Sequence, residues 1–115
     1  MGYKLGLIIR SDINMSKGKT IAQAGHAIVD ATVKAYTRTT IFYKWQSTGE
    51  TIIAVKANEK TLHAIIKIAE RKGIHCGVVC DAGKTEVAPD TITVGYVGPD
   101  TDKKIDKLIG QLKLL

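Results

Sequence analysis

The sequence predicts an α/β sandwich of three layers, in which helices cover both faces of a mixed four-stranded sheet. Two observations lead to this prediction. Apolar runs of strand length alternate with segments of helical periodicity, an order that favours parallel strands joined through helices. The last two apolar runs are instead joined by a loop rich in turn formers, which permits an antiparallel step between them.

Four strands and four helices are expected. The apolar runs predict strands at residues 5–10, 51–56, 74–80 and 91–97, and Gly98-Pro99-Asp100 is expected to end the last strand. Helices are expected at residues 18–36 and 39–46, from an N-cap at Asn58 to a stop at Gly73, and from a cap at Asp100 or Thr101 onward. A chain of 115 residues without a linker or repeat is expected to form one domain, residues 1–115.

The first predicted helix has a polar stripe. On a wheel of about 100° per residue, Gln23, His26 and Asp30 fall within about 40° of Lys19. The opposite half of the wheel is apolar and is expected to form the core face, through Ile21, Gly25, Ile28, Val29 and Ala35. The stripe would then present Lys19, Gln23 and His26 together, although a single helical histidine is equally typical of a solvated residue.

The charge of the chain indicates either a nucleic-acid partner or simply a basic surface. Seventeen Lys and Arg residues against eleven Asp and Glu leave a net charge of +6. Lys17 and Lys19 flank Gly18 where the first helix should begin, so its free backbone N–H groups and these ammonium groups resemble an anion cradle. Aromatic residues make up only 5% of the chain, so a nucleic acid would be held mainly through its phosphates.

Several classes of protein are disfavoured. The chain begins with a strand-like run and lacks a signal peptide or an apolar stretch long enough to cross a membrane, so a cytoplasmic protein is expected. Cys76 and Cys80 would lie about 13 Å apart on one strand, beyond the reach of a disulfide or of a shared zinc ion. They are interpreted as reduced, buried residues. Neither a nucleophilic-serine motif nor a dinucleotide-binding motif occurs, so no cofactor or metal is expected and any hydrolysis would use water directly.

The segment Asp81-Ala-Gly-Lys-Thr85 is the most specific candidate site. It places a carboxylate at the end of an apolar strand, followed by a glycine turn that returns a threonine hydroxyl. The alternative is an Asx-turn in which Asp81 only caps its own loop. Because ligands tend to bind beyond the carboxyl ends of parallel strands, the two loops at residues 11–18 and 81–90 are expected to build one site.

Recognisable segments occur along nearly the whole chain, as MSKGK at residues 15–19, AQAGHA at 22–27, DAGKTEVAP at 81–89, TVGYVGP at 93–99 and LKLL at 112–115. Taken together, these motifs resemble the type 2 peptidyl-tRNA hydrolases of archaea and eukaryotes. Four residues depart from the usual family pattern: Ser16, Gly25, Lys84 and Asp90. Of these, Lys84 in place of arginine would weaken a bidentate phosphate contact.

The resemblance implies a metal-independent enzyme that hydrolyses the ester between peptide and tRNA. On this hypothesis Lys19 stabilises the oxyanion, Asp81 orients or deprotonates water, and Thr85 positions that water. Gln23 and His26 would support them, with His26 as the alternative base. Lys17 and Lys84 would bind phosphates of the tRNA. A non-catalytic RNA-binding or adaptor domain on the same fold is the rival interpretation, and a homodimer is left open.

Overall fold

The sheet of the computed structural model, which describes residues 2–82, 87 and 90–115, is mixed as expected. Its strands are β1 (Tyr3–Arg10), β2 (Ile52–Ala57), β3 (Cys76–Cys80) and β4 (Ile92–Thr101). They lie in the order β2-β1-β4-β3. The pair β1 and β2 is parallel, whereas β4 runs antiparallel to both of its neighbours. As a result β1 and β3 run in the same direction and end at the same side of the sheet.

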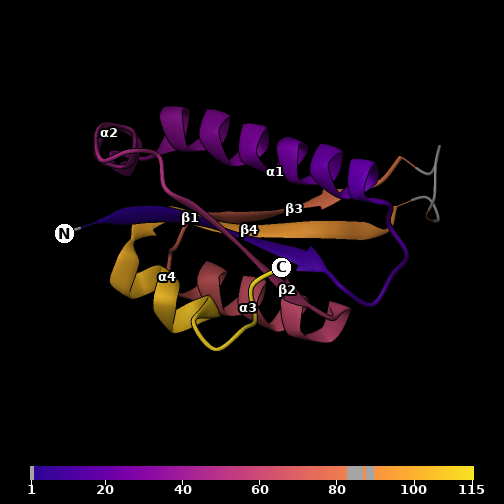
Figure 1. The fold of residues 1–115 in the computed structure, drawn as a ribbon. Helices are drawn as coiled ribbons and strands as arrows, with labels where there is room; N and C mark the ends of the chain where they lie inside the picture. The colour runs from indigo at the N-terminus through magenta and orange to yellow at the C-terminus, as the bar shows by residue number, and fades with distance from the viewer. Residues whose placement is uncertain (1, 83–86, 88–89) are drawn as a thin grey trace.

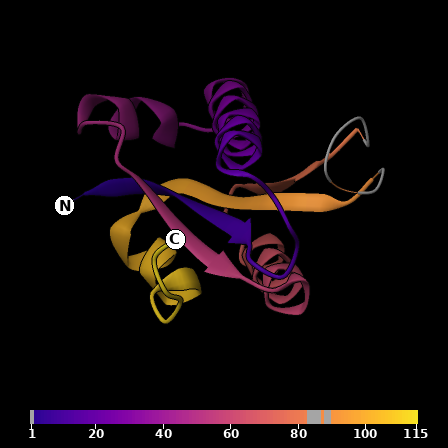
Figure 2. The same cartoon turned by 45° about the vertical axis from the view of Figure 1, so that its right-hand side comes forward.

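Helices cover both faces of this sheet, which confirms the predicted three-layer sandwich (Figures 1 and 2). The helices α1 (Lys17–Arg38) and α2 (Ile41–Ser47) lie on one face, and α3 (Glu59–Arg71) and α4 (Asp102–Ile109) lie on the other. The side chains of Ser16, Asn58 and Thr101 cap α1, α3 and α4 by accepting a hydrogen bond from a backbone amide of the first turn.

Each face of the sheet has its own apolar core. Toward α3 and α4, Ile8, Val55 and Val97 pack against Leu62, Ile65, Ile105 and Leu108. Toward α1 and α2, the core is built from large side chains of the sheet and α2 together with small ones from α1; its buried members are Leu5, Leu7, Ile9, Val94, Tyr96, Phe42, Trp45, Ala27, Ala31 and Ala35. The sheet therefore supplies most of the bulk on the α1 side.

The predicted core face of α1 is only partly correct: Ala35 is buried and Ile28 packs against the core as expected, but the rest of the predicted face does not. Ile21 and Val29, which were expected to face the core, are 66% and 62% exposed, whereas Gln23 from the expected polar stripe is only 4% exposed. The line that contacts the sheet consists of Ala27 and Ala31, extended by Gln23 and Ala35. Alanine carries little weight in a hydrophobic pattern, yet its small side chain lets the helix backbone approach the sheet closely.

The predicted end of the last strand is also wrong. Gly98-Pro99-Asp100 continues β4, which pairs with β1 as far as the partners Tyr3 and Thr101. The register between these strands shifts between Lys4 and Gly6, so the pairing is irregular where Gly98 and Pro99 lie. An irregularity of this kind accommodates a proline, which has no N–H to donate to the ladder.

The two edges of the sheet differ. The C-terminal residues return to the β2 edge, where Lys56 N–H donates to the Lys113 carbonyl at 3.0 Å and Leu115 N–H donates to the Ala54 carbonyl at 3.1 Å. On the other edge, β3 has a neighbouring strand only on its β4 side within the described residues. Both cysteines of β3 are free, but neither is fully buried as predicted: Cys76 is half-buried and Cys80 is exposed. No helix in the described ranges has the length and apolar character needed to span a membrane.

Enlarging an alanine that faces the sheet should destabilise the protein. Ala31 is fully buried, so Ala31→Leu is expected to lower the free energy of unfolding by about 1–3 kcal/mol through overpacking. The matched control is Ala22→Leu, because Ala22 is exposed on the same helix, and its effect should stay within about 0.5 kcal/mol. Urea unfolding of both variants measures the difference, and equal effects would contradict the close packing of α1 on the sheet.

Candidate active site

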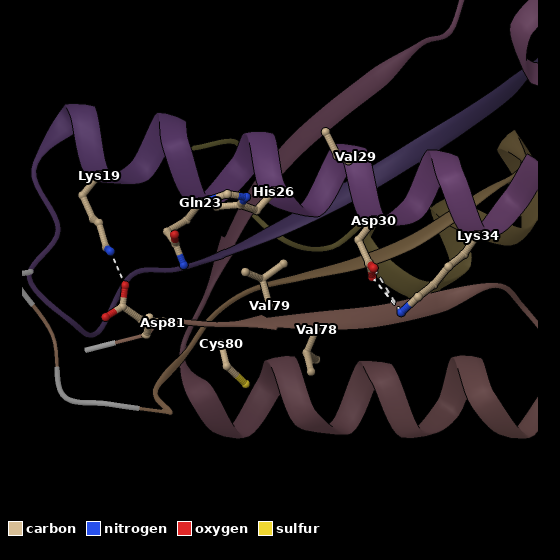
Figure 3. A pocket seen from close by; sticks show the side chains of 11 residues that line it. Lys19, Gln23, His26, Val29, Asp30, Lys34, Val78, Val79, Cys80 and Asp81 are labelled. Atoms are coloured by element: carbon tan, nitrogen blue, oxygen red, sulfur yellow. Dashed lines mark hydrogen bonds and ion pairs between the residues drawn. The ribbon is translucent and has the colours of Figure 1, made fainter. Parts of the chain in front are cut away.

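An ion pair between Lys19 and Asp81 marks the candidate site. Because β1 and β3 end at the same side of the sheet, the start of α1 after β1 lies beside the end of β3. Lys19 Nζ contacts Asp81 Oδ1 there (Figure 3). The Lys19 side chain is 12% exposed and the Asp81 side chain 3%. Two charges are therefore held together, largely shielded from water, at the carboxyl end of β3, as the two sequence motifs predicted.

Local backbone contacts hold both members of the pair. Ser16 Oγ accepts a hydrogen bond from the Lys19 N–H at 3.1 Å, which places Lys19 in the first turn of α1. Asp81 is held as an extension of β3, since its N–H donates to the Thr91 carbonyl at 2.8 Å and its carbonyl accepts from the Asp90 N–H at 3.0 Å. The lysine and the carboxylate thus come from a helix start and a strand end.

Gln23 lies one turn further along α1 and reaches into the sheet. Its Nε2 donates to Thr93 Oγ1 at 2.7 Å, and Thr93 Oγ1 donates to the Val79 carbonyl at 3.4 Å. Thr93 is fully buried and lies where the register of β3 and β4 shifts between Val79 and Cys80. A bulge of this kind redirects a side chain. The Thr93 hydroxyl therefore determines which side of the Gln23 amide faces β4.

The sequence did not single out Thr93. Its only signal was a hydroxyl in an otherwise apolar strand, since Val94, Tyr96 and Val97 are all buried in the core on one face of the sheet or the other. A threonine at such a position needs a hydrogen-bond partner because an unpaired buried hydroxyl is costly. The partner is Gln23, which the helical wheel had placed on the solvent side of α1.

The other predicted site residues either lie outside the described residues or form no hydrogen bond with the Lys19–Asp81 pair within them. His26 is exposed on α1, and within the described residues no hydrogen bond joins it to Lys19 or Asp81. Lys17 is exposed at the first position of α1. Lys84 and Thr85 lie outside the described residues. Among the residues that the structure does describe, no group of three or more His, Cys, Asp or Glu side chains is arranged to hold a metal ion.

A groove of about 570 Å³ runs from the ion pair along β3. It is bounded by side chains of α1 and by residues 78–82, which are the end of β3 and the two residues that follow it. Figure 3 shows Lys19 and Asp81 at one end, Asp30 and Lys34 towards the other, and Val79 pointing from β3 towards α1. A volume of this size is typical of sites that bind small molecules or short segments of a larger ligand.

The far end of the groove has a fixed charge pattern. Asp30 forms an ion pair with Lys34 at 3.0 Å and accepts a hydrogen bond from the Tyr96 hydroxyl at 2.8 Å. Burial alone would raise the pKa of Asp30, but the hydrogen bond from Tyr96 and the charge of Lys34 lower it below its ordinary value. Burial and the contact with Asp30 raise the pKa of Tyr96. Asp30 is therefore ionised and Tyr96 protonated at neutral pH.

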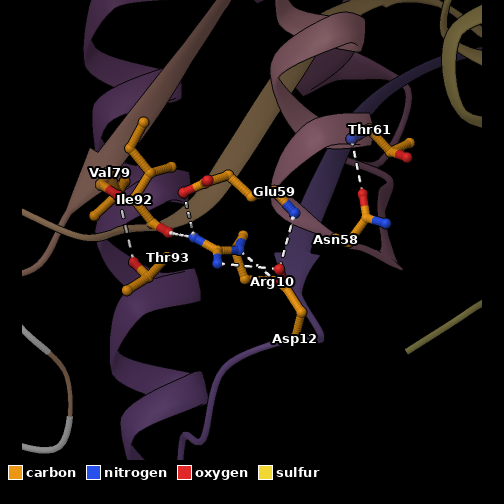
Figure 4. Close-up of polar contacts among 8 residues, drawn as sticks. All are labelled: Arg10, Asp12, Asn58, Glu59, Thr61, Val79, Ile92 and Thr93. Atoms are coloured by element: carbon orange, nitrogen blue, oxygen red, sulfur yellow. Dashed lines mark hydrogen bonds and ion pairs between the residues drawn. The ribbon is translucent and has the colours of Figure 1, made fainter.

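A second polar cluster, which the sequence did not reveal, stabilises the same end of the sheet, where β1 ends and β4 begins (Figure 4). Arg10, the last residue of β1, is 7% exposed and donates to Asp12 at 2.6 Å, to Glu59 at 3.3 Å and to the Ile92 carbonyl at 2.9 Å. The hydrogen bond from Arg10 lowers the pKa of Asp12. One guanidinium thus ties together the end of β1, the start of β4 and the start of α3, next to Thr93.

Comparison with known proteins decides which family has this arrangement. The model of the family described as peptidyl-tRNA hydrolase PTH2 matches residues 3–115. The chain belongs to this family. A peptidyl-tRNA hydrolase from Methanocaldococcus jannaschii is 41% identical over 97% of the chain and 99% of its own length. A peptidyl-tRNA hydrolase from Staphylothermus marinus is also 41% identical, over 98% of the chain and 95% of its own length.

The similarity extends beyond the archaea. The human protein named peptidyl-tRNA hydrolase 2, mitochondrial, is 40% identical over 97% of this chain and 64% of its own length. The residues matched by the family model, 3–115, include both walls of the groove, α1 and β3. The family resemblance inferred from the sequence motifs is confirmed.

Proposed function

We propose that this chain hydrolyses the ester between the peptide and the tRNA of peptidyl-tRNA, with the Lys19–Asp81 pair at the reacting bond. The observation that supports this most directly is the contact of the two side chains at the mouth of a groove. Ester hydrolysis needs a group that accepts a proton from water and a positive charge near the developing oxyanion. A carboxylate and an ammonium held side by side supply both.

In the proposed mechanism, Asp81 accepts a proton from a water molecule while that water attacks the carbonyl carbon of the ester. The negative charge that develops on the carbonyl oxygen is stabilised by Lys19. When the tetrahedral intermediate collapses, the bond between the carbonyl carbon and the ribose oxygen breaks. The proton then passes from Asp81 to the ribose oxygen of the leaving tRNA, which regenerates the carboxylate.

Neighbouring residues support this pair. Gln23 lines the groove beside Lys19, and its hydrogen bond to Thr93 holds its amide in one orientation. We assign Gln23 a positioning role towards the water or the ester. His26 also lines the groove and is the alternative base. Thr85 retains the water-positioning role suggested by its motif.

Replacing either member of the pair should abolish most of the activity. Lys19→Met and Asp81→Asn are each expected to lower kcat/KM on N-acetyl-aminoacyl-tRNA by at least about 100-fold. Because the two groups act in one step, the double variant should be little worse than the poorer single variant. Deacylation is measured with EDTA present, and near wild-type rates in both single variants would refute the assignment.

Two further variants sharpen this experiment. Lys4→Met removes a lysine that pairs with Asp106 at 2.6 Å on the opposite side of the molecule, and it should retain wild-type rates. His26→Asn should lower kcat less than tenfold if Asp81 is the base, whereas a fall equal to that of Asp81→Asn would move this role to His26. If the wild-type chain binds tRNA without releasing the acyl group, the rival RNA-binding function is favoured.

Lys17 and Lys84 are proposed to hold phosphates of the tRNA. Lys17 is exposed beside the catalytic pair, at the start of α1. Lys17→Ala is expected to raise the KM for the substrate. It should also make the association constant for tRNA less sensitive to salt, lowering the magnitude of the slope of its logarithm against log salt concentration by about 1. Lys67→Ala is the matched control because Lys67 is exposed on α3, across the sheet. Filter binding at several salt concentrations measures both, and equal slopes would contradict this role.

We also propose that the protein acts as a homodimer in the cytoplasm, where ribosomes release peptidyl-tRNA. The support for a dimer is the number of exposed apolar side chains on α1 and α2, namely Ile21, Val33, Tyr36 and Tyr43. Two copies related by a twofold axis would cover these side chains. Sedimentation velocity should detect a dimer that dissociates in Ile21→Glu, and a monomer at all concentrations of the wild-type chain would exclude it.

A further inference from the structure

The outer edge of β3 offers backbone hydrogen-bonding groups to the groove. In an antiparallel pair, alternate residues direct both their N–H and their C=O towards the neighbouring strand. On β3 the carbonyl of His75 accepts from Gly98, and both backbone groups of Asp81 bond to the β4 side. By alternation, Gly77 and Val79 also face β4. Val78 and Cys80 therefore direct their N–H and C=O groups to the opposite side, away from the sheet.

The groove lies along this edge. Its lining includes Val78, Val79 and Cys80 of β3, together with Gln23 and Asp30 of α1. Figure 3 shows the side chains of Val78 and Cys80 turned away from α1, so these side chains do not fill the space between α1 and the edge of the strand. The groove therefore has one wall of helical side chains and one wall that includes exposed strand backbone.

We propose that the peptide of the substrate binds along this groove in extended form and pairs, as an added strand, with the outer edge of β3, which has no other neighbouring strand among the described residues. The proposal rests on the proposed function, because the groove is continuous with the Lys19–Asp81 pair. Strand addition to an open edge is an established mode of peptide binding. The occupant is the peptide that is esterified to the tRNA.

The position of the reacting bond determines the direction of the peptide. Its C-terminal carbonyl carbon must lie near Asp81, which follows the last residue of β3. The rest of the peptide then extends back along Cys80 and Val78 towards Asp30 and Lys34. The peptide therefore runs parallel to β3. The four outward groups of Val78 and Cys80 would pair with a segment of about four or five residues, at about 3.3 Å per residue.

This mode of binding suits a substrate of variable sequence. Hydrogen bonds to a strand edge involve only the peptide backbone, so affinity does not depend on particular side chains. In a parallel ladder, only every second peptide residue directs its N–H to the partner strand. The proposal therefore predicts a dependence on peptide length and on backbone N–H groups with a period of two residues.

The test uses the wild-type enzyme and N-acetyl-oligoalanyl-tRNA substrates of one to six residues. The KM should fall as the peptide grows to about four or five residues and then stay level. In the five-residue substrate, N-methylation of single residues should raise the KM about two- to tenfold at every second position and less than twofold at the others. A KM independent of length, or an equal effect at all positions, would overturn the proposal.

A variant of the enzyme tests the same contact from the protein side. Val78→Pro removes one outward N–H, and proline is tolerated on an edge strand where its N–H faces away from the ladder. Val78→Thr keeps this N–H and the β-branched shape. Val78→Pro should lower the ratio of kcat/KM for the five-residue substrate to that for the one-residue substrate about two- to tenfold, whereas Val78→Thr should preserve the ratio. Equal ratios in both variants would count against strand addition.

The failure of this proposal differs from failure of the proposed function. If the wild-type enzyme releases no acyl group from any substrate, the hydrolase mechanism itself fails, and the strand proposal fails with it. If all lengths are hydrolysed at equal kcat/KM, the mechanism stands and only the strand proposal is overturned. Should Val78→Pro not fold, the N-methyl series on the wild-type enzyme still decides.

Discussion

The close approach of α1 to the sheet determines where the candidate catalytic groups lie. Alanines at the contact bring the helix near enough for the Gln23 amide to reach Thr93 on β4. The same approach brings the start of the helix beside the end of β3, so that Lys19 meets Asp81. A larger residue at Ala27 or Ala31 would lift the helix and separate both pairs. The close packing of α1 on the sheet therefore stabilises the core and also fixes the geometry of the site.

Burial makes the Lys19–Asp81 contact sensitive to what enters the groove. Each charge has lost much of its hydration, so each depends on the other for stabilisation. A water molecule or an ester carbonyl that arrives between them meets strong, oriented charges with little competition from solvent. The Arg10 cluster stabilises the strand ends around this point, because it joins β1, β4 and α3 through hydrogen bonds to a single side chain.

Sequence patterns were informative where side chains are large or backbone constraints are local. Apolar runs and N-caps such as Asn58 gave the order of the elements, and the shared direction of two strand ends brought Lys19 and Asp81 together as predicted. The core face of α1 was only partly predictable from hydrophobicity, because most of its buried contacts are alanines while Ile21 and Val29 point outward.

The remaining errors have a different cause. The Gln23–Thr93 bond and the Arg10 cluster join residues 70 and 82 positions apart in the chain. The spacing of residues in the sequence cannot predict such contacts, because they depend on the register of β4 against its neighbouring strands. The continuation of β4 through Pro99 likewise depends on an irregularity in its pairing with β1. The features that were predicted depend on local propensity, whereas the features that were missed depend on the register of strands far apart in the sequence.

The unequal edges of the sheet have a consequence for solubility. Unpaired strand edges are templates for aggregation between chains. Here the C-terminal residues seal the β2 edge through the bonds at Lys56 and Leu115, while the β3 edge lies beside a groove whose helical wall carries Lys19, Asp30 and Lys34. Charged side chains next to a strand discourage its pairing with other sheets. Within the described residues, the outer edge of β3 therefore lacks a neighbouring strand, while the charges beside it limit the risk of polymerisation through this edge.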